Sequence, residues 1–83
     1  MPNKKIGTVT HFYTDISVGI IELSKKLQVG DTIKFEGYTT DFEQEVKSMQ
    51  YDHKDIEEAK KGQEIGVRVD EKVREGDEVY LVE

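Results

Sequence analysis

Hydrophobic and polar residues alternate along most of this chain in short runs, which is the pattern of half-buried β-strands. The alternation is cleanest at residues 32–36, with Ile33 and Phe35 expected inward, and at residues 64–69. Six strands are predicted in all, at residues 4–13, 18–23, 32–36, 41–51, 64–69 and 78–82. Residues 54–61 have the only helical character, with Asp55 placed to cap one short helical turn.

Two of the predicted strands break strict alternation. Ile20 and Ile21 are adjacent and follow Gly19, and the apolar phase changes between Val46 and Met49. A β-bulge accounts for such a change, because it adds one residue to one strand of a pair. We therefore expect a bulge or bend in each strand.

A seven-residue pattern occurs three times, each time before a predicted strand. It places an apolar residue three positions before a glycine, and a polar side chain follows that glycine. Glycine is the residue best suited to a turn with positive φ, and a neighbouring Asp or Gln can bind turn N–H groups. The three copies are Leu27-x-x-Gly30-Asp31-x-Ile33, Ala59-x-x-Gly62-Gln63-x-Ile65 and Val73-x-x-Gly76-Asp77-x-Val79. The fold predicted is all-β, a small six-stranded antiparallel closed β-barrel, as a single domain over residues 1–83 with a flexible N-terminus at residues 1–4.

Composition argues against several classes of protein. The net charge is −6, made of +2 in residues 1–26 and −8 in residues 27–83, whereas nucleic-acid affinity depends mainly on clustered Lys and Arg. There is no cysteine, and no apolar run approaches the roughly 20 residues that span a bilayer. We expect a cytoplasmic protein with no membrane association.

Neither a hydrolytic nor a metal site is indicated. The candidate nucleophiles Ser17, Ser24 and Ser48 and the candidate bases His11 and His53 lie in no nucleophile-elbow motif. Asp52-His53-x-Asp55 matches no metal-ligand spacing and favours an acidic surface loop. We predict no catalytic residues and no metal, and hence not an enzyme, with a small enzyme as a remote alternative.

Nucleotide and RNA binding find little support in the residues. Gly62-Gln-Glu-Ile-Gly66 lacks the Lys-Ser/Thr end of a phosphate loop, so neither a cofactor nor GTP binding is expected. Phe12 and Phe42 are expected in the core or in cross-strand pairs rather than stacked on bases. The basic doublets Lys4-Lys5 and Lys25-Lys26 supply the candidate RNA-binding residues, which are Lys4, Lys5, Lys25 and Lys26.

The chain resembles the second domain of translational GTPases of the elongation factor Tu and 1-alpha kind. The match covers about residues 5 to 82 and centres on Val46-Lys-Ser-Met49-Gln50 and Ile56-Glu-Glu-Ala59-Lys-Lys-Gly62-Gln-Glu-Ile65-Gly66-Val67. Gly7-Thr-Val9 and Val73-Arg-Glu-Gly-Asp77 extend it, the latter with Glu75 inserted between arginine and glycine. The chain is also similar to the small C-terminal barrel of the collagenase-like peptidase family, at Gly37-Tyr-Thr-Thr-Asp-Phe-Glu43 and Glu57-Glu-Ala-Lys-Lys-Gly62.

Both resemblances imply an accessory barrel that positions RNA or docks on other domains. They carry over turn glycines and core residues, which specify a fold and not a reaction. We therefore predict a free-standing, translation elongation factor-like, non-catalytic binding module, docking on a separate protein partner in translation or RNA modification. The alternative is a module that binds RNA, such as tRNA, directly. The sequence leaves the oligomeric state open.

Overall fold

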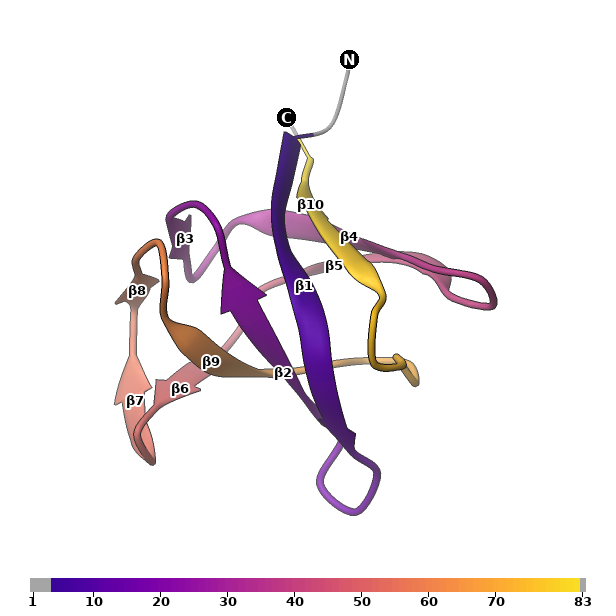
Figure 1. Cartoon of the computed structure of the whole chain (residues 1–83). Coiled ribbons are helices and arrows are strands. Elements are labelled where there is room, and N and C mark those ends of the chain that lie inside the picture. Colours follow the sequence, from indigo (N-terminus) through magenta and orange to yellow (C-terminus); the bar gives the residue numbers. More distant parts are fainter. Residues whose placement is uncertain (1–3, 83) are drawn as a thin grey trace.

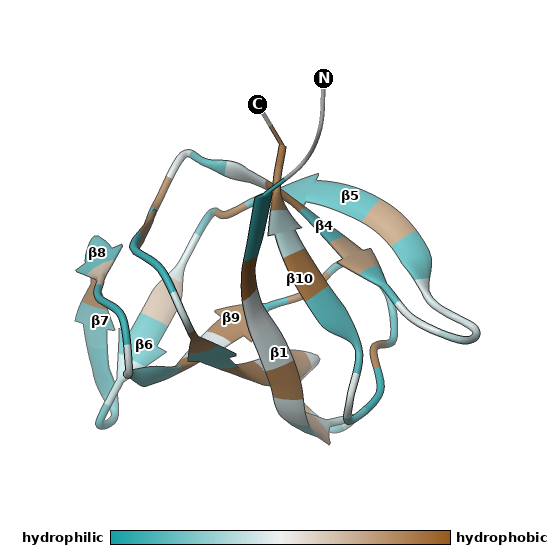
Figure 2. Cartoon of the chain, turned by 45° about the horizontal axis from the view of Figure 1, so that its top comes forward, coloured by the Kyte–Doolittle hydropathy of each residue, from teal (hydrophilic) through white to brown (hydrophobic). Residues whose placement is uncertain are grey.

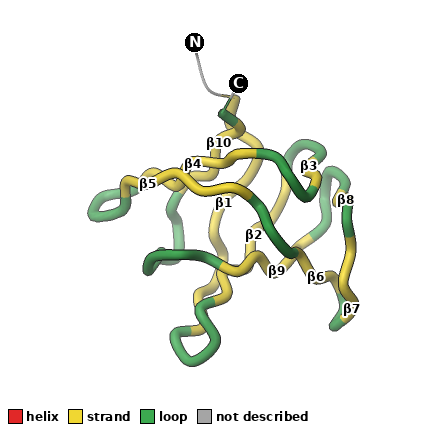
Figure 3. Tube along the Cα trace, turned by 180° about the vertical axis from the view of Figure 1, so that it is seen from behind, coloured by secondary structure: helices red, strands yellow, loops and turns green. Residues whose placement is uncertain are grey.

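The computed structural model describes residues 4–82, and these residues form strands and loops without a helix (Figures 1 and 3). The strands are β1 (Lys4–Tyr13), β2 (Val18–Leu23), β3 (Leu27–Gln28), β4 (Thr32–Glu36), β5 (Asp41–Glu45), β6 (Met49–Tyr51), β7 (Lys54–Ile56), β8 (Glu58–Ala59), β9 (Glu64–Arg68) and β10 (Glu78–Leu81). Within this part of the chain no helix exists that could cross a membrane. The predicted flexible N-terminus lies outside the described residues except for Lys4, which begins β1.

Eight of the strands form one antiparallel sheet in the order β5-β4-β10-β1-β2-β9-β6-β7, and β3 pairs with β8 in a second, small sheet. The large sheet curls around the core as an open half-barrel, with β5 and β7 on opposite sides of the molecule (Figure 1). The all-β class is confirmed. The prediction of a closed six-stranded barrel is wrong, because β5 and β7 end the sheet and do not pair with each other.

The core fills the concave face of this sheet, and apolar and polar bands alternate along β1, β5 and β10 (Figure 2). Phe35 is fully buried and stacks on Phe42 with ring centroids 5.0 Å apart, while Phe12 also packs against the core. The prediction that Phe12 and Phe42 lie in the core or in cross-strand pairs is confirmed. The buried apolar residues are Ile6, Val9, Ile21, Leu23, Leu27, Ile33, Phe35, Val46, Met49, Ala59, Ile65, Val67, Val69, Val73 and Val79.

The three glycine corners predicted from the sequence are present. Gly30, Gly62 and Gly76 have φ of 101°, 89° and 91°. In each corner the polar side chain after the glycine accepts a hydrogen bond from the backbone N–H three residues earlier. These bonds are Gln28 N to Asp31 Oδ2 (3.0 Å), Lys60 N to Gln63 Oε1 (2.8 Å) and Arg74 N to Asp77 Oδ2 (2.8 Å).

Each corner also docks on one buried residue of another segment by a reciprocal pair of backbone hydrogen bonds. The glycine N–H donates to that residue's carbonyl, and that residue's N–H donates to the carbonyl of the Asp or Gln after the glycine. The docked residues are Val46 for the Gly30 corner, Leu23 for the Gly62 corner and Val9 for the Gly76 corner. The repeated pattern thus builds the same joint three times, and these joints fix how the sheet curls.

The predicted strand at residues 41–51 is divided into β5 and β6 instead of carrying a bulge. Val46 is engaged by the Gly30 corner, so the chain leaves one edge of the sheet there and joins the other edge at Met49. The open side beside β5 is bridged by the buried Gln44 side chain. Its Nε2 donates to the Arg68 carbonyl and its Oε1 accepts from Asp70 N–H, both at 2.8 Å.

The predicted helical turn at residues 54–61 is wrong. Lys54–Ile56 pairs with Met49–Tyr51 as a hairpin, and Ala59 pairs with Leu27. Asp55 accepts a hydrogen bond from Gln50 Nε2 (3.0 Å) across this hairpin. A single helical turn is weak alone, so strand pairing prevails. The bulge expected near Ile20 lies in the partner strand, where the β1 register shifts between Val9 and His11.

Candidate functional site

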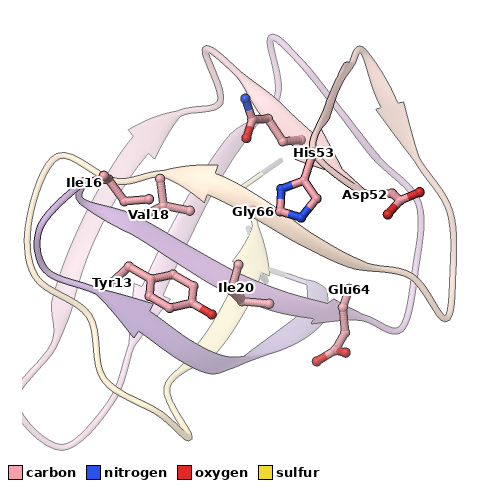
Figure 4. Close-up of a pocket in the computed structure, with 9 residues that line it drawn as sticks. Tyr13, Ile16, Val18, Ile20, Asp52, His53, Glu64 and Gly66 are labelled. Atoms are coloured by element: carbon pink, nitrogen blue, oxygen red, sulfur yellow. The ribbon is translucent and has the colours of Figure 1, made fainter.

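A groove crosses the outer, convex face of the sheet above β2 and β9. Its floor is made of Val18, Ile20 and Gly66, which the strand alternation turns away from the core (Figure 4). A Cβ at Gly66 would lie 3.1 Å from Val18 Cγ1 and 3.5 Å from Ile20 Cδ1. Because residue 66 has no side chain, Val18 and Ile20 pack directly against its backbone, and no side chain from this position fills the groove.

The groove consists of two hollows of about 250 Å³ each, which share Ile16, Val18, Gln50 and Gly66. Such volumes fit single amino-acid side chains better than a drug-sized molecule. The groove follows β9 from Glu64 to Arg68. These four residue steps correspond to about 13 Å, the length of roughly four residues of an extended peptide.

The aromatic ring of Tyr13 lines the groove on the β1 side. The bulge in β1 brings His11 opposite Ile20 and Tyr13 opposite Val18, and the two rings lie 5.0 Å apart between centroids. Tyr13 is 47% exposed and Ile16, in the loop after β1, is 60% exposed. Apolar surface of this kind loses contact with water only when another molecule covers it.

Both loops that border the groove contain non-glycine residues at positive φ. Asp52 (55°) and His53 (63°) form the two-residue turn of the β6–β7 hairpin, and Ser17 (54°) precedes β2. Positive φ at both central residues is the geometry of a type I′ turn. Ser17 is fixed by its carbonyl, which accepts a hydrogen bond from Val69 N–H at 2.9 Å. The two walls thus have defined conformations.

The groove has opposite charges at its two ends. Asp52 and Glu64 lie at one end and Ile16 and Val18 toward the other (Figure 4), where Arg68 also lines the groove. Glu64 accepts a hydrogen bond from Thr10 Oγ1 at 3.1 Å. Within residues 4–82 neither Asp52 nor Glu64 forms an ion pair, so both carboxylates are available to a ligand.

The candidate catalytic residues are only partly brought together. Ser48 and His53 line the two hollows of the groove, and His11 Nδ1 lies 3.2 Å from Glu75 Oε2. Across the described part of the chain no hydrogen bond joins a serine to a histidine. Residues 4–82 also contain no group of three side chains placed to hold a metal ion.

The four candidate RNA-binding lysines come from segments that lie next to each other, since Ser24 N–H donates to the Ile6 carbonyl at 2.7 Å. All four are exposed. Lys5 Nζ lies 3.1 Å from Glu78 and Lys26 Nζ 3.3 Å from Glu58. The hydrogen bond from Lys5 lowers the pKa of the Glu78 carboxyl. A role for Lys4, Lys5, Lys25 and Lys26 in binding RNA stays a prediction.

Apart from the groove, a larger hollow of about 460 Å³ lies beside β3 and β8, lined by Gln28, Val29, Glu57 and Glu58. Gln28 Nε2 donates to Glu58 Oε2 at 2.8 Å, and this bond, with Lys26, lowers the pKa of Glu58. Its polar groups therefore bind one another, which leaves fewer of them for a ligand. The outer groove is the better candidate site.

Comparison with known proteins points to one class of enzyme. The chain is 53% identical over 79 residues to an uncharacterized protease of Methanocaldococcus jannaschii, and 35% identical over 77 residues to a collagenase of Porphyromonas gingivalis. These matches cover 94% and 90% of this chain but only 19% and 21% of the relatives, so the chain spans about a fifth of their length. No protein-family model matches the chain.

Among solved structures, the chain is similar to the C-terminal domain of a Geobacillus thermoleovorans protein described as a U32 peptidase. The TM-score is 0.90 with 13% identity, over 96% of this chain and 93% of that one. At this identity the likeness shows the fold. Taken together, the chain is similar to the C-terminal domain of the U32 peptidase and collagenase family, which confirms the second of the two resemblances.

Three expectations from the sequence are corrected by these relatives. The resemblance to the second domain of elongation factors is not supported. The prediction of a translation elongation factor-like adaptor is wrong, because the relatives are named as a protease and a collagenase. The prediction that the chain is not an enzyme is wrong on the same finding, since those names point to a family of peptidases.

Sequence reasoning missed the outer groove. Its signal was Val18 and Ile20, two apolar residues in the outward phase of β2, together with Gly66 on the neighbouring strand. The adjacency of Ile20 and Ile21 predicts a bulge and does not by itself show that Ile20 faces outward. Gly66 lies opposite Ile20 and near Val18, which indicates a shallow floor, but only once the pairing of β2 with β9 is known.

Proposed function

We propose that this chain is a polypeptide-binding part of a peptidase of the U32 and collagenase family, and that the outer groove holds an extended stretch of the protein substrate. Its relatives supply the reaction class. The groove supplies the observation that carries the proposal: an apolar floor above Gly66, about four residues long, between two loops of defined conformation. The proposed partner is therefore an unfolded or extended polypeptide.

The distribution of exposed apolar side chains supports this choice of surface. Five large hydrophobic residues are exposed among the described residues. Tyr13 and Ile16 line the groove, and Tyr51 directly precedes the Asp52 turn. Tyr38 and Val29 lie elsewhere and serve as matched controls.

Binding to fluorescein-labelled denatured collagen, measured by fluorescence anisotropy, tests the proposal. Covering Ile16 or Tyr13 contributes about 1–2 kcal/mol, so Ile16→Ser and Tyr13→Ser should each weaken binding roughly 5- to 30-fold. Val29→Ser and Tyr38→Ser should leave it unchanged. Because all four side chains are exposed, these variants should retain the fold.

Two results would overturn the proposal: no binding of any unfolded polypeptide, or an equal loss in the control variants. Unrelated reduced and alkylated polypeptide serves as a second ligand and separates collagen-specific from general binding. Release of small fluorescent fragments during the same incubation would show, in addition, that the chain itself cleaves the polypeptide.

A further inference from the structure

The charged end of the groove has a consequence for the sequence of the bound polypeptide. Asp52 comes from the β6–β7 turn and Glu64 from the start of β9, and both line the hollow that contains Tyr13 and Ile20 (Figure 4). A ligand side chain on the apolar floor therefore has two carboxylates and one aromatic ring beside it.

From this placement we infer that the groove prefers a peptide segment in which an apolar residue is adjacent to a lysine or arginine. The apolar side chain rests on Val18 and Ile20, above Gly66. The neighbouring cation lies at the end formed by Asp52 and Glu64, where the two carboxylates attract it. This inference rests on the proposed function and adds the substrate class.

Three further features of the structure support a cationic occupant. Neither carboxylate has an ion-pair partner within residues 4–82, and the one bond to Glu64 comes from the neutral Thr10 hydroxyl. The net charge of −6 attracts basic segments over longer range. At the opposite end of the groove Arg68 disfavours a second cation, so the charges also set the direction in which the peptide lies.

His53 lines the same hollow as the two carboxylates. The test is made at about pH 8, where Asp and Glu side chains are ordinarily ionised and Lys and Arg side chains are ordinarily protonated. Under this condition the carboxylates and the cation of the ligand both carry their full charge.

Three capped peptides test the inference, each with a central leucine followed by lysine, glutamine or glutamate. An exposed ion pair is worth about 0.2–1 kcal/mol, so each carboxylate should favour the lysine peptide over the glutamine peptide by roughly 1.4- to 5-fold. We expect the order lysine, glutamine, glutamate. Raising the ionic strength from about 50 to 300 mM should reduce the differences in affinity among the three peptides, because salt screens exposed charges.

Isosteric variants assign the preference to the groove. Asp52→Asn keeps a residue that tolerates positive φ, and Glu64→Gln keeps an oxygen that accepts from Thr10. Combined, they should remove the preference for lysine while leucine-dependent binding remains. Glu71→Gln, an exposed carboxylate outside the groove, is the control and should preserve the preference.

The outcomes separate this inference from the proposed function. Equal affinities for the three peptides, with binding still lost in Ile16→Ser, would overturn the charge preference and leave the proposed function standing. Tighter binding of the glutamate peptide would also overturn it. Absence of binding by all three peptides and by denatured collagen would refute the proposed function itself.

Discussion

Gln44 replaces strand pairing on the open side of the half-barrel. Its amide lies between the Arg68 carbonyl and the Asp70 N–H, with 2.8 Å to each, and the residue is only 7% exposed. One side chain thus joins β5 to the end of β9, two segments that form no backbone ladder with each other. We expect this bridge to be among the most stabilising polar contacts of the domain.

Its contribution can be worked from the two groups that it satisfies. Gln44→Ala leaves a carbonyl and an N–H without their partner, and a buried unsatisfied group costs about 1–3 kcal/mol. Arg68 and Asp70 are both exposed residues, so water recovers part of each loss, and a total of about 2–4 kcal/mol is expected. The free energy of unfolding of a domain of this size is roughly 4–12 kcal/mol. The melting temperature of Gln44→Ala should therefore be lower than the parent's by about 10–25 °C.

Gln44→Glu should make the stability of the domain depend on pH, which a simple loss of packing would not do. The new carboxylate still accepts from Asp70 N–H but has no proton for the Arg68 carbonyl. Burial and that carbonyl raise its pKa in the folded state above the unfolded value near 4.3. The variant should therefore approach the parent's stability at pH values below the unfolded pKa, and lose it as pH rises through the folded pKa.

Urea unfolding between about pH 4 and pH 8 measures this difference in free energy. Glu43→Gln, an exposed neighbour on the same strand, is the control and should unfold like the parent at each pH. A loss below about 0.5 kcal/mol for Gln44→Ala, or a pH-independent deficit for Gln44→Glu, would refute the bridging role, since surface substitutions alone fall within that range.

Three further predictions concern the corners and one ion pair. A Cβ on Gly62 meets nothing within 4 Å, so Gly62→Ala should lower the free energy of unfolding by about 1–2 kcal/mol through positive φ alone. Gly62→Asn should lower it less, and thermal unfolding measures both. Equal melting temperatures for both variants and the parent would contradict this. In Gly37→Ala the new Cβ would overlap the Asp77 carboxyl, so the free energy of unfolding should fall by about 1–3 kcal/mol. A melting temperature equal to the parent's would contradict this. The pKa of Glu78, which Lys5 lowers, should rise toward its ordinary value in Lys5→Met, as followed by NMR titration, and a pKa unchanged by that substitution would exclude Lys5 as the cause.

The parts of the fold predictable from sequence are those set by neighbouring residues. Glycine corners need only local backbone geometry, and all three were found with the expected positive φ. Alternation in β4 and β9 likewise places Ile33, Phe35, Ile65 and Val67 in the core as expected. In each case a window of seven residues or fewer contains the whole physical cause.

The errors concern residues whose partners are distant in sequence. Residues 41–51 form two strands because Val46 is hydrogen-bonded to the Gly30 corner. Residues 54–61 form strands and not a helical turn because Ala59 pairs with Leu27. The elongation factor resemblance failed for a related reason. Its shared residues are turn glycines and core apolar positions, which many β-domains need and which define no ligand.

The groove arises from the same joints that shape the core. The Gly62 corner holds Leu23, the last residue of β2, and so fixes β2 against the start of β9. That pairing sets Ile20 opposite Gly66, with Val18 two residues away on the same face, and leaves a floor that apolar side chains line but do not fill. A corner built for folding thereby positions the surface assigned here to the polypeptide. A substitution that shifts the Gly62 corner should consequently weaken peptide binding more than an equally destabilising change at the Gly76 corner, which docks on Val9 in β1.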